Sequence, residues 1–372
     1  MTLAQPDFNK KVVFLEIQIG KEKVGRMVIQ LRSDKVPLAA ENFRCLCTGE
    51  KGVSSISGAN LSYKNTKFNT IKKLFMVQGG DIVKNDGTNG ESIYGKTFES
   101  EQSDLEHSEG AVGMANFGKP NTNNSQFYIC AVDAPHLNET NTVVGYVIRG
   151  LGIISEMEQY TSDDGKPEKD VIVSDCGEIL EGEDFEVHDN DETEDHLPPF
   201  PRDWKLWEAD LTMDEMTRYL ECITAAGDFF ASQERFVEAA RKYKKAIRFY
   251  RYFNDRTNLP AEKEQLKLWL HDNSVNLAGA QLKLQNYVET INAASDALKI
   301  KPNNGTALFY RAQARAARKM YELSLDDLKK ALKESSGDKK RAAEILDEFE
   351  RVKKLLLDYR ETQKKAYAKM FK

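Results

Sequence analysis

The residues from Lys67 to Gly95 read KFNTIKKLFMVQGGDIVKNDGTNGESIYG, and this stretch is typical of strands joined by turns. Glycine and asparagine interrupt it, as in NDGTNG, and it contains neither histidine nor arginine. Upstream, roughly alternating β-branched residues at 12–20 and 24–32 flank a short polar turn, which predicts a β-hairpin. Short helices are predicted at 37–49, between a proline and a glycine, and at 150–160. Strand-rich sequence with few helices predicts a closed or nearly closed β-barrel.

Composition limits the class of protein. The chain has 372 residues, 40% hydrophobic and 30% charged, which indicates a soluble protein of two domains. No run approaches the roughly eighteen apolar residues of a membrane span, and the first residues lack the apolar core of a secretory signal. The net charge of −6 does not favour binding to nucleic acid. Five scattered cysteines without a CxxC motif favour reduced thiols in the cytoplasm, or also in the nucleus, over disulfides or a zinc site.

The composition changes near residue 180. Residues 181–195 contain nine acidic side chains in fifteen and no basic one, and a proline-containing segment follows. This pattern predicts a solvated linker that is extended by its own charge and stiffened by proline, although an acidic docking segment stays open as an alternative. The predicted organisation is a barrel domain at 1–180, a linker at 181–203, helical repeats at 204–336 and a final helix at 337–372.

A repeat emerges in the helical half. Similar segments begin at Phe236, Tyr287 and Tyr321, and the second and third starts are 34 residues apart. The first and second are 51 apart, which fits one repeat with an insertion of 17 residues that lengthens the intervening helices. A period of 34 residues is the signature of tetratricopeptide repeats, so three such repeats are predicted. Each segment carries a small residue at its eleventh position, namely Ala246, Ala297 and Ala331.

Two further patterns support a stack of helix pairs. Gly227, Ala278 and Ala312 each lie nine positions before the aromatic start of a segment, where two helices must approach closely. The final helix carries an apolar stripe that is predicted to cap the stack, made of Ile345, Phe349, Val352 and Leu356.

The first half resembles the cyclophilins across residues 12–178. The matching segments are DKVPLAAENFRCLCTGEKG, FMVQGGDIVKNDGTNGESIYG, GMANFGKPNTNNSQFYI and VSDCGEIL. With the acidic linker and the repeats, the chain is similar to large two-domain cyclophilins of the immunophilin co-chaperone type. The resemblance implies an eight-stranded antiparallel β-barrel with capping helices, followed by an all-α repeat domain. It also implies cis–trans isomerisation of X–Pro bonds without a cofactor, whose unaided barrier is about 18–20 kcal/mol.

The resemblance also implies the residues of the isomerase site. The family's apolar proline pocket and backbone-holding groups map to Phe75, Met76, Gln78, Ala115, Asn116, Gln126, Tyr128 and Leu137. His136 stands where many small cyclophilins carry a tryptophan that grips cyclosporin, so cyclosporin is expected to bind weakly at best.

The family's catalytic cation is missing. In the family, an arginine donates to the prolyl nitrogen and stabilises the twisted state, but Thr70 occupies that position here. Asn69 and Asn141 replace two family histidines. Isomerase activity is therefore expected to be weak or absent. Lys72 or Lys73, which map toward the far end of the segment, could replace the missing cation, and this alternative stays open. A fully active isomerase that works with heat-shock chaperones also stays open.

The helical half lacks most of another family site. Chaperone-binding relatives use five residues to clamp the carboxylates of an acidic C-terminal peptide. The five positions read Thr224, Asp228, Asn276, Thr306 and Tyr310, and only Asn276 fits. A protein partner in the repeat groove is still expected, with weakened binding of a chaperone tail. Arg311 and Arg315 could supply positive charge or lie on an exposed helix face, and a degenerating relative without a defined partner also stays open.

Overall fold

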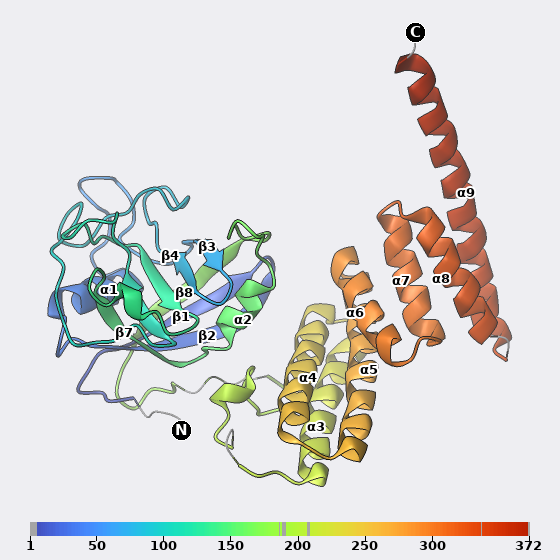
Figure 1. Cartoon of the computed structure of the whole chain (residues 1–372), viewed down its shortest axis with the longest axis horizontal. Coiled ribbons are helices and arrows are strands. Elements are labelled where there is room, and N and C mark those ends of the chain that lie inside the picture. The colour runs from blue at the N-terminus through green and yellow to red at the C-terminus, as the bar shows by residue number, and fades with distance from the viewer. Residues whose placement is uncertain (1–5, 186, 188–190, 207–208, 336, 371–372) are drawn as a thin grey trace. The chain divides into compact units, whose positions relative to one another are not determined.

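The computed structural model describes residues 6–185, 187, 191–206, 209–335 and 337–370, without the side chains of 365–370. The chain forms two compact units, shown in Figure 1. The first comprises residues 1–190 and 196–209, and the second comprises 191–195 and 210–372.

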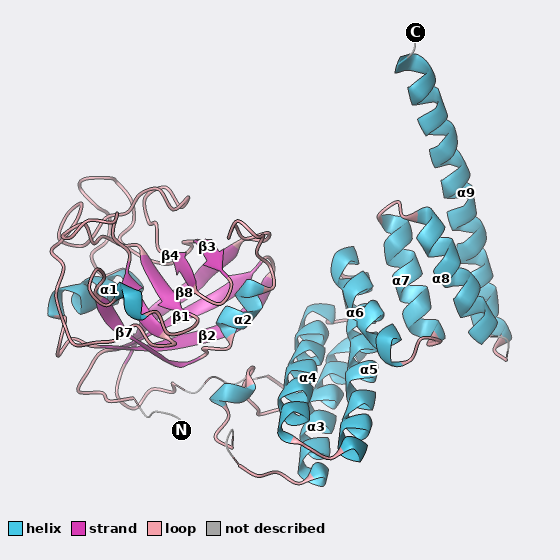
Figure 2. Cartoon of the chain, in the orientation of Figure 1, coloured by secondary structure: helices cyan, strands magenta, loops and turns pink. Residues whose placement is uncertain are grey.

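The first unit is built on an eight-stranded antiparallel sheet that curls into a half-barrel (Figure 2). Its strands are β1 (Val12–Ile19), β2 (Glu22–Leu31), β3 (Phe68–Lys72), β4 (Met76–Gly79), β5 (Ala111–Met114), β6 (Phe127–Cys130), β7 (Val143–Arg149) and β8 (Val171–Ile179). Their order across the sheet is β3-β4-β6-β5-β7-β2-β1-β8. An isolated bridge between Lys67 and Ile172 joins the two edges of the sheet.

Local sequence explains the elements of this unit. The predicted hairpin forms, because β1 pairs with β2 and alternate β1 side chains enter the core. Helix α1 (Pro37–Thr48) begins at its proline and ends where Gly49 adopts a left-handed φ of 70°. Helix α2 (Ile153–Glu158) is shorter than the predicted 150–160 segment, and the 3-10 turns η1 (Pro135–Leu137) and η2 (Pro201–Asp203) complete the unit. Inside the sheet, Phe43 packs against Phe127 with ring centroids 5.1 Å apart.

The second unit consists of helices that pack in chain order. They are α3 (Met213–Ser232), α4 (Phe236–Arg256), α5 (Pro260–Lys283), α6 (Tyr287–Ile300), α7 (Gly305–Ala317), α8 (Tyr321–Glu334) and α9 (Lys339–Met370). Each contacts the next, and α3 also contacts α5, as α5 does α7 and α7 does α9. The predicted repeat starts at Phe236, Tyr287 and Tyr321 are the first residues of α4, α6 and α8. Helices α4 and α5 have 21 and 24 residues against 14 for α6, so the insertion lengthens these two helices as predicted.

Close helix approach and capping are also confirmed. A Cβ atom on Gly227 would lie 2.6 Å from the ring of Tyr243, so α3 and α4 meet where the sequence predicts a small residue. On α9, Ile345, Val352 and Leu356 are buried in the core of the helical unit, and Phe349 packs against it. The last helix therefore covers the apolar end of the stack.

The prediction of a solvated linker is wrong for Asp195 and for residues 197–201 and 203, which are buried. Residues 181–184, 192, 194, 196 and 202 are exposed, and residues 186 and 188–190 lie outside the described part. Asp195 is fully buried in the helical unit, 2.7 Å from the Lys242 ammonium and 2.8 Å from that of Lys245. Phe200 belongs to the barrel core. The sequence pattern fails here because the two lysines that hold Asp195 come 47 and 50 residues later in the chain.

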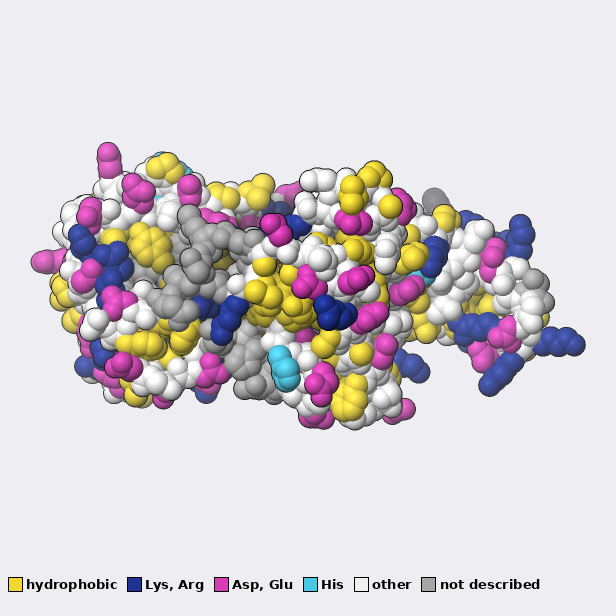
Figure 3. Space-filling view, turned by 90° about the horizontal axis from the view of Figure 1, so that it is seen from below, with side chains coloured by type: hydrophobic (Ala, Val, Ile, Leu, Met, Phe, Trp, Pro, Cys, Tyr) yellow, Lys and Arg dark blue, Asp and Glu magenta, His cyan; other side chains and the backbone are white. Residues whose placement is uncertain are grey.

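Acidic and basic side chains occur together on the face shown in Figure 3. In the described part of the chain, no helix combines the length and the apolar character needed to cross a membrane.

Candidate functional site

A row of four residues crosses adjacent strands of the curled sheet. Thr70 on β3 lies opposite Gln78 on β4, Gln78 lies opposite Tyr128 on β6, and Tyr128 lies opposite Gly113 on β5. Directly opposite residues of an antiparallel pair share one face of the sheet. The row therefore places the predicted catalytic position beside two predicted binding residues.

A β-bulge sets the direction of Thr70. Phe68 pairs with Gly79 while Thr70 pairs with Gln78, so Asn69 is the extra residue of the bulge. Phe68 and Ile71 are buried in the inner core, whereas Asn69 and Thr70 are only partly buried. The bulge thus lets two successive side chains turn away from the core, and one of them is Thr70.

Tyr128 forms the floor of an apolar cluster on the same face. A Cβ atom on Gly113 would lie 2.3 Å from the Tyr128 ring, so the ring covers a position that only glycine can occupy. The cluster brings together the predicted pocket residues Phe75, Met76, Ala115, Tyr128 and Leu137. These five residues come from four separate parts of the sequence, and they are adjacent in the fold.

His107, which the sequence analysis missed, holds the hydroxyl group of Tyr128. Its Nε2 atom lies 2.8 Å from the Tyr128 oxygen, and its Nδ1 atom lies 2.8 Å from Oδ1 of Asn138. The backbone N–H of His107 donates to the same Oδ1 at 2.9 Å, which assigns that atom as the amide oxygen. Nδ1 is therefore the donor, and Nε2 accepts from Tyr128.

Burial explains why this chain of hydrogen bonds is neutral. Desolvation lowers the pKa of His107 and raises the pKa of the Tyr128 hydroxyl, so both groups keep their uncharged forms near pH 7. The tyrosine hydroxyl is occupied by His107, and the cluster in front of it stays apolar. No sequence motif marks His107, although the glycine within strand β5 is a signal of close approach.

Gln78 of the row forms a second network with the amide side chain of Gln126. Gln78 donates from Nε2 to Oε1 of Gln126 at 3.0 Å, and Gln126 donates to the carbonyl groups of Gly87 and Asn89. The buried carboxylate of Asp81 accepts backbone N–H groups of that same loop, including those of Gly87 and Asn89 at 3.0 and 3.1 Å. Asp81, also missed from the sequence, therefore orders the loop that positions Gln126.

The remaining predicted residues lie around the cluster. Asn116 donates to the carbonyl of Thr140 at 2.8 Å, and Asn141 donates to the carbonyl of Met114 at 3.1 Å. The exposed ring of His136 stacks on Phe75, with centroids 5.5 Å apart and an angle of 26° between the planes. The two asparagines thus hold the backbone, while His136 extends the apolar wall.

The two lysines near Thr70 differ in placement. Both are exposed, and Lys73 lies in the turn between β3 and β4, as expected from its place in the segment. Lys72, however, pairs with Met76 in the row next to that of Thr70. Its side chain passes Gly165, where a Cβ would lie 3.4 Å from Cγ of Lys72 and 3.8 Å from Cγ2 of Thr70. Both lysines therefore lie at the turn end of β3, as expected, but Lys72 shares its side of the strand with Thr70 because the two residues are two positions apart in a regular stretch.

The helical unit contains a groove of about 860 Å³. Three of the five predicted clamp positions line it, namely Asn276, Thr306 and Tyr310. Asp228 accepts hydrogen bonds from the groove residues Tyr243 and Asn276, at 2.7 and 3.2 Å. Thr224 instead bonds with Asn273, at 3.0 Å between Nδ2 and Oγ1.

The arginines considered as substitutes serve another purpose. Arg311 forms a two-pronged ion pair with the buried carboxylate of Asp327, at 2.8 and 2.9 Å, and Arg315 binds the same carboxylate at 2.6 Å. The interpretation of both arginines as an exposed helix face is wrong, because Asp327 on α8 holds them. Their charge is used inside the helical unit.

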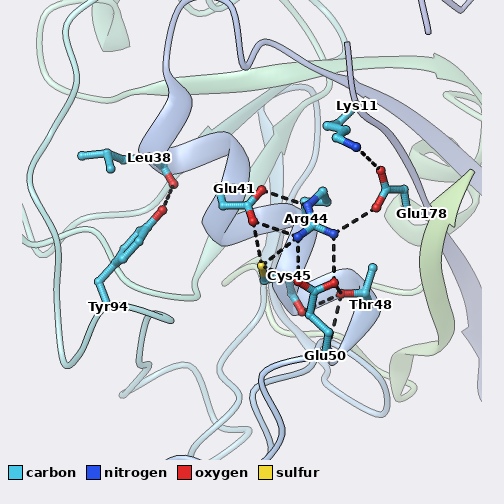
Figure 4. Close-up of polar contacts among 9 residues, drawn as sticks. All are labelled: Lys11, Leu38, Glu41, Arg44, Cys45, Thr48, Glu50, Tyr94 and Glu178. Carbon is cyan, nitrogen blue, oxygen red and sulfur yellow. Dashed lines mark hydrogen bonds and ion pairs between the residues drawn. The ribbon is translucent and has the colours of Figure 1, made fainter. Parts of the chain in front are cut away.

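A group of potential metal ligands in the barrel is an ion-pair network (Figure 4). Ligand atoms of Glu41, Cys45 and Glu50 lie within 4.8 Å of one another. The Arg44 guanidinium binds both carboxylates, at 2.8 and 2.7 Å, and also Glu178 at 3.0 Å. These hydrogen bonds lower the pKa of Glu50 to about 2, while burial and Glu41 raise the pKa of the Cys45 thiol to about 12. The thiol is therefore protonated near neutral pH and is a poor metal ligand.

A curled antiparallel sheet that carries an apolar cluster beside a network of amide side chains is the arrangement of a cyclophilin-type domain. Residues 14–178 match the family model described as cyclophilin type peptidyl-prolyl cis-trans isomerase/CLD. The chain thus carries a cyclophilin-type peptidyl-prolyl isomerase domain followed by a region of several helices. Proteins with this domain act on polypeptides that contain proline.

Proposed function

We propose that the barrel binds X–Pro segments at the Tyr128 cluster but isomerises them weakly or not at all. The observation that carries this proposal is the placement of Thr70. It occupies one end of the Thr70–Gln78–Tyr128–Gly113 row, beside the apolar cluster, where the reaction needs a cation. A threonine hydroxyl is neutral and too short to reach the nitrogen that an arginine would contact. Losing one preorganised donor lowers turnover by about 10²–10³-fold.

A working enzyme is the second candidate function, and Lys72 favours it. Lys72 lies on the same side of β3 as Thr70 and pairs with the cluster residue Met76. A lysine is a point charge on a flexible stem, without the planar fork of arginine. Its ammonium group could approach a bound X–Pro segment, but it would be less well positioned than an arginine.

Three substitutions decide between these candidates. Thr70→Arg should raise kcat/KM on a short X–Pro peptide by about 10²–10³-fold, because it restores the missing donor. Lys72→Met should leave the rate unchanged, and Lys73→Met is its matched control, since Lys73 is equally exposed but lies in the turn. If Lys72→Met alone reduces the rate tenfold or more, the enzyme uses Lys72 and the second candidate is correct.

We also infer that the helices are three tetratricopeptide repeats that hold a protein partner in the 860 Å³ groove. The 34-residue spacing of Tyr287 and Tyr321, together with contacts between every second helix, supports the repeat assignment. The scattered cysteines, among them the buried free thiols of Cys45, Cys47 and Cys130, favour action in the cytoplasm.

Binding of an acidic chaperone tail should be weak. Four of the five clamp positions lack the expected residue, and each missing charge-assisted bond contributes about 1.5–3 kcal/mol. The affinity should therefore fall from micromolar to millimolar or weaker. Calorimetry with a pentapeptide from such a tail measures it directly, and micromolar binding would contradict the proposal.

A further inference from the structure

A carboxylate borders the groove in the helical unit, next to two of the residues that line it. Asp228 on α3 is exposed, and one of its oxygens accepts hydrogen bonds from the Tyr243 hydroxyl and the Asn276 amide. Both donors are neutral; burial raises the pKa of Tyr243, so its hydroxyl keeps its proton. The two bonds fix the orientation of Asp228 without neutralising it.

Aromatic rings form much of the groove wall. Phe236, Tyr243, Tyr287, Phe309 and Tyr310 all line it. The faces of such rings carry partial negative charge and attract ammonium and guanidinium groups. A carboxylate that accepts a hydrogen bond from Tyr243, at the edge of this aromatic wall, is therefore suited to a cation, and the same group repels an anion.

The basic side chains near the groove do not reverse this preference. Arg351 lines the groove but binds Glu348 through two contacts of 2.6 Å, and Arg311 and Arg315 bind Asp327. Lys283 also lines the groove, but it lies two turns along α5 from Asn276, or about 10 Å. The side chains that contact Asp228 are therefore neutral, and one of them, Tyr243, belongs to the aromatic wall.

We propose that this groove binds a segment of a partner protein that presents a lysine or arginine among apolar residues. The cation pairs with Asp228, and the apolar neighbours pack on the aromatic wall. The proposal rests on the proposed function of the groove as a partner site and specifies the chemistry of that partner.

Two matched peptides test the preference on the full chain. The probes are acetyl-Ala-Leu-Lys-Leu-Ala-amide and the same peptide with glutamate in place of lysine. Both have blocked ends and no proline, so only the central charge differs and the barrel has no X–Pro segment to bind. Calorimetry should give an affinity for the lysine peptide at least about tenfold higher than for the glutamate peptide.

Variants assign the effect to Asp228. Asp228→Asn keeps an oxygen that can accept from Tyr243, and it should reduce binding of the lysine peptide about tenfold. Asp228→Lys should reverse the order of the two peptides. Asp326→Asn is the control, because Asp326 is an exposed aspartate on α8, with 64% of its side chain accessible. It should leave both affinities unchanged.

The three possible negative results of this experiment lead to different conclusions. Equal binding of the two peptides overturns the charge preference but leaves the groove as a partner site. Binding of neither peptide overturns the groove as a site for polypeptides, and with it that part of the proposed function. Retention of the preference in Asp228→Asn overturns the role of Asp228.

Discussion

The face of the barrel around Tyr128 and the interior of the helical unit hold their polar groups in opposite ways. On the barrel face, neutral groups bind one another, as in the chains from Tyr128 to His107 and from Gln78 to Gln126. In the helical unit, by contrast, charged side chains form ion pairs around buried carboxylates. Lys242 and Lys245 both bind Asp195, and Arg311 and Arg315 both bind Asp327.

This difference matters because binding a proline-containing segment and accelerating its isomerisation need different chemical groups. A neutral, apolar face is suited to a proline ring and its flanking amides, and under the function proposed above it lacks an arginine to stabilise a twisted amide in the transition state. In the helical unit, charge is abundant but is largely used for internal contacts, and two groove residues, Tyr243 and Asn276, orient the carboxylate of Asp228. The barrel face therefore carries neutral hydrogen-bond networks, whereas the helical unit carries buried ion pairs.

The largest expected effect concerns the buried ion pairs of the helical unit. Asp195→Ala removes the carboxylate shared by Lys242 and Lys245, which are 0% and 1% exposed. Removing one partner of a buried ion pair typically costs about 3–5 kcal/mol, so the helical unit should be destabilised by that amount. Urea unfolding followed by far-ultraviolet circular dichroism measures the change.

The control for this experiment is Glu194→Gln, which alters the exposed neighbouring acid. Such a surface change should shift the free energy of unfolding by less than about 0.5 kcal/mol. If Asp195→Ala lowers the free energy of unfolding no more than Glu194→Gln does, the segment 191–195 does not stabilise the helical unit. The contrast between a neutral barrel face and an ionic helical interior would then be wrong for Asp195.

An intermediate effect is expected for the neutral hydrogen bond between His107 and Tyr128 on the barrel face. His107→Leu removes the acceptor of the Tyr128 hydroxyl, which is buried in a side chain only 4% exposed. An unsatisfied buried hydroxyl costs about 1–3 kcal/mol, so His107→Leu should lower the free energy of unfolding of the barrel by about that amount.

The rescue variant makes this test specific. Adding Tyr128→Phe to His107→Leu removes the stranded hydroxyl and should recover most of the lost stability. If the double variant is less stable than His107→Leu alone, then Tyr128 contributes through something other than its bond to His107.

The smallest effect concerns pH. The hydrogen bonds to Arg44 lower the pKa of Glu50 from 4.5 to about 2 in the folded barrel. The ion pair therefore contributes stability above pH 4.5 and loses it as the pH falls toward 2. Because 42% of the Glu50 side chain is exposed, the contribution at pH 6 should be about 1 kcal/mol or less.

Comparison of Glu50→Gln with the original protein isolates this contribution. The original should be the more stable of the two at pH 6, and its advantage should shrink by pH 2.5. Glu168→Gln, at an exposed glutamate, serves as the control and should show no such trend. A constant difference across the pH range would contradict the role of Arg44.

The sequence was most informative where contacts are local or where residues recur in register. The hairpin at 12–32, the proline and glycine at the ends of α1, and the starts of α4, α6 and α8 could all be predicted. It was least informative where a partner lies far along the chain. Nothing near Asp195 indicates its lysines, and nothing near Tyr128 indicates His107, 21 residues earlier.

The most direct test of the account is exchange spectroscopy by nuclear magnetic resonance on a short X–Pro peptide with the original protein and with Thr70→Arg. One titration gives both the affinity and the rate of cis–trans exchange in the bound state. The account predicts similar affinities for the two proteins, with exchange about 10²–10³-fold slower in the original protein. Equally fast exchange in both proteins would show that the site needs no arginine at position 70, and the central claim would be wrong.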